Sequence, residues 1–199
     1  LMNVTTFKKS YWNYFLELEE QLISTKRFFT FDKNNFKSFS IEYLKLFQAV
    51  CSEIDVVGKT IAQEFDSGHN KKDLNIKKWG YILQKAFPSI ESEVVLFEND
   101  IKLQPWRNWK YEEYKNKKGC RSLRLSDGKS TPSWWNSYNK VKHERTTYIE
   151  NGKTNYSLAN LENLINAMSA LFIVETYFIC YLNKDKSIDF KPSELFRIQ

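Results

Sequence analysis

The stretch from Ile41 to Phe65, IEYLKLFQAVCSEIDVVGKTIAQEF, has the most regular helical period in this chain of 199 residues. Its apolar residues recur every three or four positions and form one stripe: Leu44, Phe47, Cys51, Ile54, Val57, Ile61 and Phe65. That spacing predicts one long helix, capped at its start by Ser38 or Ser40. Gly58 lies on the same stripe, where its missing side chain would let another helix approach closely.

Four more segments carry a helical period. One covers about residues 7–29, and a shorter one covers about 75–87 and stops before Pro88. Thr131-Pro132 is a typical helix start and predicts a helix to about Thr147. Ser157 is a candidate cap for a final long helix to about Leu182, after which the tail is polar.

The sequence pattern changes between the third and fourth predicted helices. Residues 94–97 and 101–103 flank the turn Glu98-Asn99-Asp100 and predict a small β-hairpin, although Ser89 to Glu93 could also open a helix. Residues 105–130 are expected to form a long ordered loop with a helical turn around Glu112. We therefore predict a single all-α domain over residues 1–199, a bundle of about five helices with a hairpin and basic loop inserted at about 89–130.

The composition favours a packed, intracellular protein. Hydrophobic residues make up 42% of the chain and aromatic residues 16%, with only six Gly and four Pro. The three cysteines are far apart and form neither a disulfide framework nor a metal-ligand spacing, and we expect no metal and no cofactor. The first residues have no signal-peptide core, so we predict a cytoplasmic location.

One apolar segment, Leu164 to Leu182, is about long enough to cross a bilayer. It also contains Asn166, Ser169 and Glu175, and its apolar residues continue a one-sided helical period. We expect a buried central helix, and no membrane partner, rather than a membrane span. A buried carboxylate at Glu175 would need a partner, from the preceding helix or from a second subunit.

The charge is unevenly spread. The net charge is +6, yet twelve Lys and Arg residues and only four acidic residues lie between Lys102 and Arg145. The remainder of the chain is therefore slightly acidic. A local excess of this kind favours a polyanionic partner.

The basic segment ends in WWNSYNKVKHER, residues 134–145, which contains one of the two histidines. On a helix, Asn136, Asn139, Lys140 and His143 share a polar face, opposite the apolar residues Trp134, Tyr138 and Val141. A histidine can exchange protons near neutral pH, and adjacent cations can hold a phosphate. The alternative is an exposed helix with ordinary solvated charges. His69, in a polar connector, has no such neighbours.

The stretch YNKVKHER (residues 138–145), followed by a long apolar helix, resembles the HEPN superfamily. The resemblance covers mainly the two C-terminal helices. It implies a helical bundle that dimerises, and many members are metal-independent ribonucleases of toxin–antitoxin, abortive-infection and CRISPR-linked systems. Residues 52–59 are also similar to the acid-and-lysine helix of some abortive-infection members, although Asp55 and Lys59 equally fit an intrahelical ion pair.

The chain departs from the family pattern in one respect. The family places an arginine four to six residues before the histidine, where this chain has Tyr138, Ser137 and Asn136. Asn139 and His143 match the polar and histidine positions. Lys140, Lys142, Arg145 or Arg107 would have to replace the arginine, and Lys140 is the best placed on the helix.

The resemblance implies a catalytic site of His143, Lys140, Asn139 and Arg145 in a homodimer, with an antitoxin or another protein as a further partner. His143 would move a proton while a cation stabilises the phosphate, leaving a 2′,3′-cyclic phosphate and a 5′-hydroxyl. The residues expected to bind RNA are Lys142, Asn136, Arg107, Trp109, Lys115, Lys117, Lys118, Arg121, Arg124 and Trp135.

Two other interpretations stay open. The missing arginine also fits a non-catalytic HEPN-like module that binds RNA, a nucleotide or a protein. A purely structural protein could instead use the basic loop to dock an acidic partner. Trp109 and Trp135 are the candidates for base stacking, whereas tryptophans could also pin the loop onto the bundle, as we expect for Trp134.

Overall fold

The computed structural model describes residues 2–68, 70–119, 121–125 and 131–199. Its helices are α1 (Val4–Phe7), α2 (Asn13–Ser24), α3 (Ile41–Phe65), α4 (Ile76–Ala86), α5 (Ser133–His143) and α6 (Leu161–Leu182). Its strands are β1 (Val95–Phe97), β2 (Ile101–Leu103), β3 (Tyr111–Lys115), β4 (Arg121–Leu125) and β5 (Phe196–Ile198). The prediction of an all-α fold is wrong, because two small antiparallel sheets accompany the helices.

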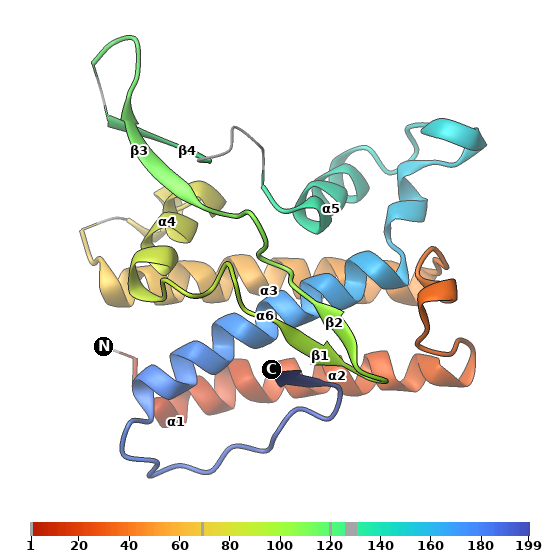
Figure 1. Cartoon of the computed structure of the whole chain (residues 1–199), viewed down its shortest axis with the longest axis horizontal. Helices are drawn as coiled ribbons and strands as arrows, with labels where there is room; N and C mark the ends of the chain where they lie inside the picture. Colours follow the sequence, from red (N-terminus) through yellow and green to blue (C-terminus); the bar gives the residue numbers. More distant parts are fainter. Residues whose placement is uncertain (1, 69, 120, 126–130) are drawn as a thin grey trace.

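Helices α3 and α6 pack against each other at the centre of the molecule (Figure 1). Helix α3 has the predicted extent, and Ser40 caps it by accepting a hydrogen bond from the Tyr43 N–H at 3.1 Å. Helix α6 is apolar and long enough to cross a membrane by composition, but most of it is buried inside the protein. It is the core helix that the sequence predicted. Its cap is Asn160, which accepts from Asn163 N–H, and not Ser157.

The first helix is shifted from the predicted range of 7–29. It begins at Val4 and ends at Ser24, and a π-helical segment at Lys8–Trp12 joins α1 to α2. The α-helix ends there because the side-chain hydroxyls of Ser24 and Thr25 donate to the carbonyls of Gln21 and Leu22, and a 3-10 helix over Thr25–Arg27 continues to near the predicted end. Such local hydrogen bonds compete with continuation of a helix.

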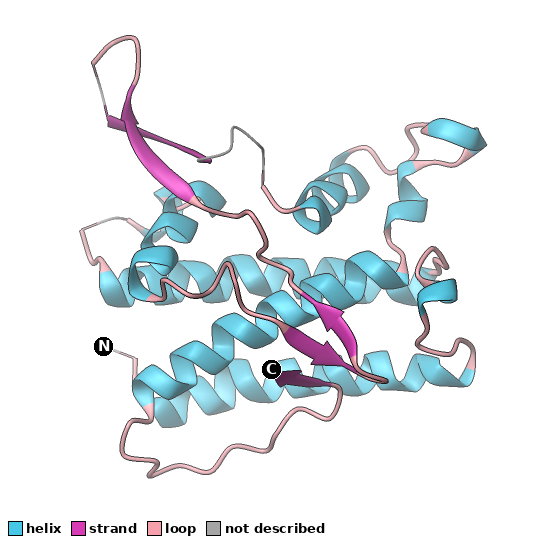
Figure 2. Ribbon diagram, in the orientation of Figure 1, coloured by secondary structure: helices cyan, strands magenta, loops and turns pink. Residues whose placement is uncertain are grey.

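The predicted β1–β2 hairpin is confirmed, with Val95 opposite Leu103 and Phe97 opposite Ile101. Its turn places Asn99 and Asp100 at positive φ, a conformation that Asn and Asp tolerate well. The tail is not merely polar, since β5 pairs with β1 to complete a three-stranded sheet (Figure 2).

Buried Glu19 of α2 holds the start of that last strand. Its carboxylate accepts hydrogen bonds from the Ser193 hydroxyl and from the backbone N–H groups of Glu194 and Leu195. Glu19 lies 176 residues before Leu195 in the chain. The interaction therefore links the two ends of the sequence, and no local sequence pattern predicts it.

Within the expected loop at 105–130, strands β3 and β4 form a second hairpin, and Glu112 lies in β3 and not in a helical turn. Residue 120 and residues 126–130 of that loop lie outside the described part of the chain. Strands β3 and β4 pair antiparallel, with Glu112 opposite Arg124 and Lys115 opposite Arg121. This two-stranded sheet, here called the basic ribbon (residues 111–125), projects from the helical body on the same side as α5 (Figure 1). Helix α4 (Ile76–Ala86) forms where the sequence predicted a helix. It supports the base of the ribbon by contacting both strands.

Five tryptophans form one cluster above α3: Trp79, Trp106, Trp109, Trp134 and Trp135. Two glycines make the packing of this cluster possible. A Cβ at Gly58 would lie 2.8 Å from the Trp79 ring, and one at Gly80 would collide with the ring of Trp109. The close approach predicted at Gly58 is confirmed, because the ring of Trp79 on α4 lies against it.

Candidate nucleic-acid interface

The basic ribbon is a two-stranded sheet that carries exposed cations. In β3 only Tyr111 is buried, and Lys115, Lys117 and Lys118 are exposed at the far end of the ribbon. Among the described residues, Lys115 and Lys117 form no ion pair. The ribbon thus joins the core through Tyr111 at its base and presents positive charge to solvent at its far end. The side chain of Arg121 lies outside the part of the chain that the structure describes.

Cross-strand contacts hold the ribbon in shape. The Arg124 side chain is exposed, donates from Nε to Glu112 at 2.7 Å and lies 5.1 Å above the Tyr114 ring. An exposed ion pair contributes only about 0–1 kcal/mol. At the base, Tyr81 of α4 donates to Glu113 at 2.7 Å, which fastens β3 to the helix.

Helix α4 adds cations that the sequence interpretation overlooked. Lys77, Lys78 and Lys85 are exposed on its polar face, and Lys85 lies 4.3 Å from the centre of the Tyr81 ring. A hydrogen bond with Tyr81 raises the pKa of Lys85, so this lysine stays protonated. The signal was in the sequence, because α4 has no acidic residue. Only the packing of α4 beneath the ribbon shows that these charges belong with it.

Helix α5 exposes the polar residues expected of a site at His143. His143 and Lys140 are exposed and one turn apart, and Asn139, which directly precedes Lys140, is half-buried. Lys142 is exposed and lies 5.5 Å from the centre of the Tyr138 ring. These side chains also occupy the last turn, where positive charge favours the negative end of the helix dipole.

Arg145 does not share that face. The helix predicted to reach Thr147 ends at His143, and Glu144 leaves the helical conformation. Arg145 turns back, donating from Nε to the Val141 carbonyl at 3.4 Å. The cause is tertiary: the Asn155 side chain donates to the Glu144 carbonyl at 2.9 Å, which draws the chain away from the helix axis.

Arg107 and Asn136 meet at the opposite end of α5. They line an open cavity of about 450 Å³ together with Thr131 and Ser133. Asn136 also donates to the Thr131 carbonyl at 3.0 Å, so it braces the start of the helix. His143 lies about two turns further along, roughly 10 Å on. The structure thus divides the predicted site between the two ends of α5.

Trp109 and Trp135 are only 1% and 7% exposed, so neither ring offers a free face to a base. Each belongs to the tryptophan cluster, and the buried Trp134 donates from Nε1 to the Pro105 carbonyl at 2.9 Å. The alternative interpretation, that tryptophans pin this segment to the helices, is the one that the packing matches. The rings of Tyr81, Tyr114 and Tyr138 lie beside exposed cations of α4, the ribbon and α5.

Acidic side chains are arranged differently from the cations. Both carboxylate oxygens of Glu175 are buried without a hydrogen-bond partner in the described part of the chain. Burial raises the pKa of Glu175 well above its ordinary value, and the nearby Glu53 raises it further. No described group of three or more His, Cys, Asp or Glu side chains could hold a metal ion.

Comparison of the chain with models of known protein families, with curated proteins and with solved structures finds no match. What the chain does must therefore be argued from its own geometry. The features with chemical meaning are a projecting cationic ribbon, the cations of α4 beneath it, and the polar end of α5.

Proposed function

We propose that this protein binds single-stranded RNA through the basic ribbon, with help from the cations of α4 and α5. One observation carries the proposal: Lys115, Lys117 and Lys118 are exposed at the end of a ribbon whose strand β3 buries only Tyr111. Their role cannot be to fill the core. Lysines in such an array neutralise phosphates and release counterions, which is the main source of affinity for nucleic acids.

RNA suits this surface better than a compact acidic ligand does. The three elements that carry these cations, α4, the ribbon and α5, lie on the same side of the molecule (Figure 1). A flexible chain of evenly spaced phosphates can follow such a surface. The rings of Tyr81 and Tyr114 are half-buried among these cations, an arrangement that suits unpaired bases.

The test is a titration of the triple variant Lys115→Gln, Lys117→Gln, Lys118→Gln with an unstructured, fluorescently labelled oligoribonucleotide. The control variant, Lys33→Gln, Lys184→Gln, Lys186→Gln, removes the same charge from three exposed lysines elsewhere. We expect the ribbon variant to bind at least about tenfold more weakly, with a salt slope smaller by about 2. Equal losses in both variants, or no binding by the wild type, would refute the proposal and favour an acidic protein partner.

The exposed pair of His143 and Lys140, one turn apart on α5, supports a second candidate function. It is the metal-independent endoribonuclease of toxin or phage-defence type that the HEPN resemblance implies. His143 would take the proton of an RNA 2′-hydroxyl while Lys140 stabilises charge on the phosphate. The 2′-oxygen attacks phosphorus, the 5′-oxygen leaves with a proton, and a 2′,3′-cyclic phosphate remains.

His143→Ala should then abolish cleavage in EDTA while leaving RNA affinity within about twofold, and His69→Ala should cleave normally. Absence of cleavage by the wild type at saturating concentration, with binding intact, would leave the binding function alone. The cytoplasmic location, the homodimer and the antitoxin or other protein partner belong to this proposal as well. Light scattering of the purified protein would test the homodimer directly.

A further inference from the structure

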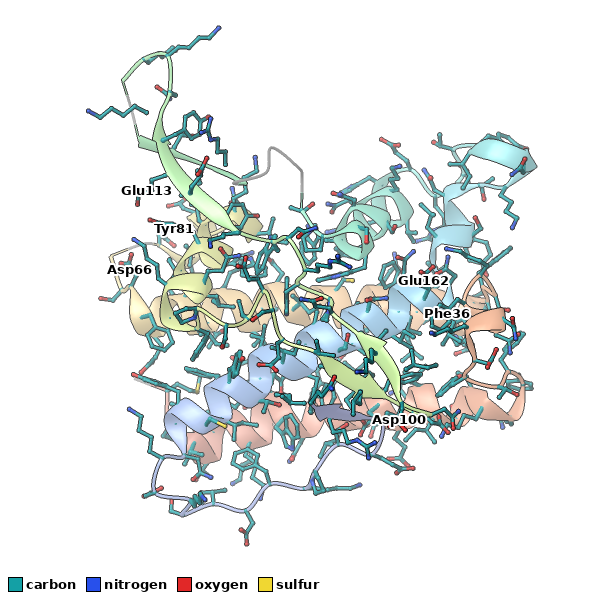
Figure 3. The ribbon with its side chains drawn as sticks, in the orientation of Figure 1. Phe36, Asp66, Tyr81, Asp100, Glu113 and Glu162 are labelled. Carbon is teal, nitrogen blue, oxygen red and sulfur yellow. The ribbon has the colours of Figure 1, made fainter. Side chains whose placement is uncertain are left out.

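A cavity of about 730 Å³ lies between α4, the end of α3 and the basic ribbon. Figure 3 shows three of its lining residues, Glu113 on β3, Tyr81 on α4 and Asp66 after α3, on this side of the molecule. The volume is in the usual range of pockets for small organic ligands. None of the residues predicted from sequence as functional lines this cavity.

The wall of the cavity is divided by chemical type. One part is apolar or aromatic and contains Phe65, Tyr81, Ile82 and Leu123. Three exposed lysines of α4 supply positive charge: Lys77, Lys78 and Lys85. Asp66 and Glu113 place carboxylates in the same wall. A ligand that fits must therefore combine a flat apolar part, negative charge and hydrogen-bond donors.

We infer that this cavity receives a base of the bound RNA strand, with the adjoining phosphates on the lysines of α4. The base would lie against Tyr81 and the apolar wall, as unpaired bases lie on aromatic side chains. Amino groups of the base would donate to carboxylate oxygens of the wall, which accept several hydrogen bonds each. The inference rests on the proposed RNA binding and gives the surface a means of distinguishing RNA from other polyanions.

Other ligand classes fit the wall less well. A purely apolar ligand would bring no negative charge to the lysines of this wall, of which Lys85 already lies 3.9 Å from Glu113. An acidic peptide would bring carboxylates against Asp66 and Glu113, where like charges repel. A nucleotide carries its negative charge at one end and its hydrogen-bond donors at the other, which matches both kinds of group.

The test compares three probes with the intact protein: an unstructured oligoribonucleotide of about twelve nucleotides, the same chain without its bases, and adenosine monophosphate. We expect the complete chain to bind at least about fivefold more tightly than the abasic one, since stacking adds affinity for each base. Equal affinity for both chains would overturn the base pocket and leave the phosphate-binding ribbon standing. Binding of neither chain would refute the proposed function itself. Adenosine monophosphate binding as tightly as the chain would identify a free nucleotide as the ligand and overturn the RNA assignment.

Ala86→Trp would fill the cavity from α4 without removing a charge, and Ser52→Trp adds the same ring at an exposed position of α3 outside the cavity wall. The filled variant should lose the preference for bases yet keep its affinity for the abasic chain, whereas the control keeps both. A preference that survives filling would place the bases elsewhere. If Ala86→Trp does not fold, crosslinking of 4-thiouridine RNA to the wild type decides: crosslinks at Tyr81 or Phe65 support the pocket, and crosslinks only at other residues overturn it.

Discussion

The two hairpins of this protein are close in sequence and opposite in construction. In β1–β2, alternate residues are buried (Val95, Phe97, Ile101 and Leu103), and β5 covers one edge. In β3–β4, Tyr111 is the buried residue of β3, and charged side chains occupy much of the rest. The first hairpin is part of the core, whereas the second is carried by α4 and presented to solvent.

The two hairpins therefore have different roles: the first contributes to stability, and the second to the proposed binding. An exposed strand edge can pair with another chain, and proteins protect such edges by covering them or by charging them. The first hairpin is covered and the second is charged. Changes in or around the first should therefore alter folding, while changes at the end of the second should alter only what the protein binds.

The largest effect is expected at the latch of the first sheet. Glu19→Ala would leave the Glu194 and Leu195 N–H groups without their carboxylate, and loss of such charge-assisted hydrogen bonds should destabilise the protein by about 3 kcal/mol. Urea denaturation would measure it. Glu20→Ala, on the exposed neighbour, should change stability by less than about 0.5 kcal/mol. Equal stabilities of the two variants would show that β5 is not held by Glu19.

The next effect concerns the base of the second hairpin. Gly80→Ala would push a methyl group into the ring of Trp109 beside Tyr111, and such overpacking costs about 1–3 kcal/mol. Gly68→Ala, where the nearest atom is a side-chain oxygen of Asp66 at 3.2 Å, is the control and should cost much less. Thermal unfolding followed by tryptophan fluorescence would report both. An unchanged midpoint for Gly80→Ala would mean that the ribbon does not dock tightly on α4.

A smaller effect, with a defined pH dependence, is expected in the core at Glu175 of α6, near Glu53 of α3. The raised pKa of Glu175 means that the folded state prefers the neutral carboxyl, so stability is greatest at low pH and falls as pH rises through the raised pKa. Glu175→Gln should therefore stabilise the protein by about 1–2 kcal/mol at pH 8 and by little at pH 5. The exposed control Glu17→Gln should show neither change. A loss of stability at pH 8 would indicate that Glu175 is ionised and paired.

The smallest effect on stability is expected at the end of the ribbon. The triple glutamine variant of Lys115, Lys117 and Lys118 should unfold within about 0.5 kcal/mol of the wild type, because exposed charges contribute little to folding. Urea denaturation at two salt concentrations would test this. A larger loss would erase the distinction between the hairpins, since the ribbon would then support the fold as well.

Features that depend on neighbouring residues could be predicted from the sequence, whereas features that depend on long-range contacts could not. The α3 stripe, the extent of α4 and the β1–β2 turn were predicted, and Ser40 was one of two candidate caps for α3, because each depends on neighbours in the sequence. The end of α5 was not, since Asn155 draws Glu144 away from the helix. Strand β3 buries only Tyr111, and the charged residues of this segment matched a loop equally well.

The sequence identified the polar and basic residues of the candidate site, but it did not predict how they are arranged in space. The exposed His143, Lys140 and ribbon lysines were identified as polar or basic from sequence, and their roles in RNA binding or cleavage stay predictions. Burial of Trp109 and Trp135 could not be foreseen, because a tryptophan beside cations has the same local signature whether it stacks on a base or on another tryptophan. The cavity beneath the ribbon depends on three elements meeting, and no single segment contains it.

Most of the helices, the first hairpin and the concentration of positive charge follow from local spacing and composition, so they can be read from the sequence. The pairing of β5 with β1, held by Glu19, follows only from long-range contacts. The tertiary structure also shows that α4 joins its lysines to the ribbon, and that α5 separates Arg107 from His143. Long-range packing brings together groups that lie far apart in the sequence, and no local sequence pattern relates such groups to each other.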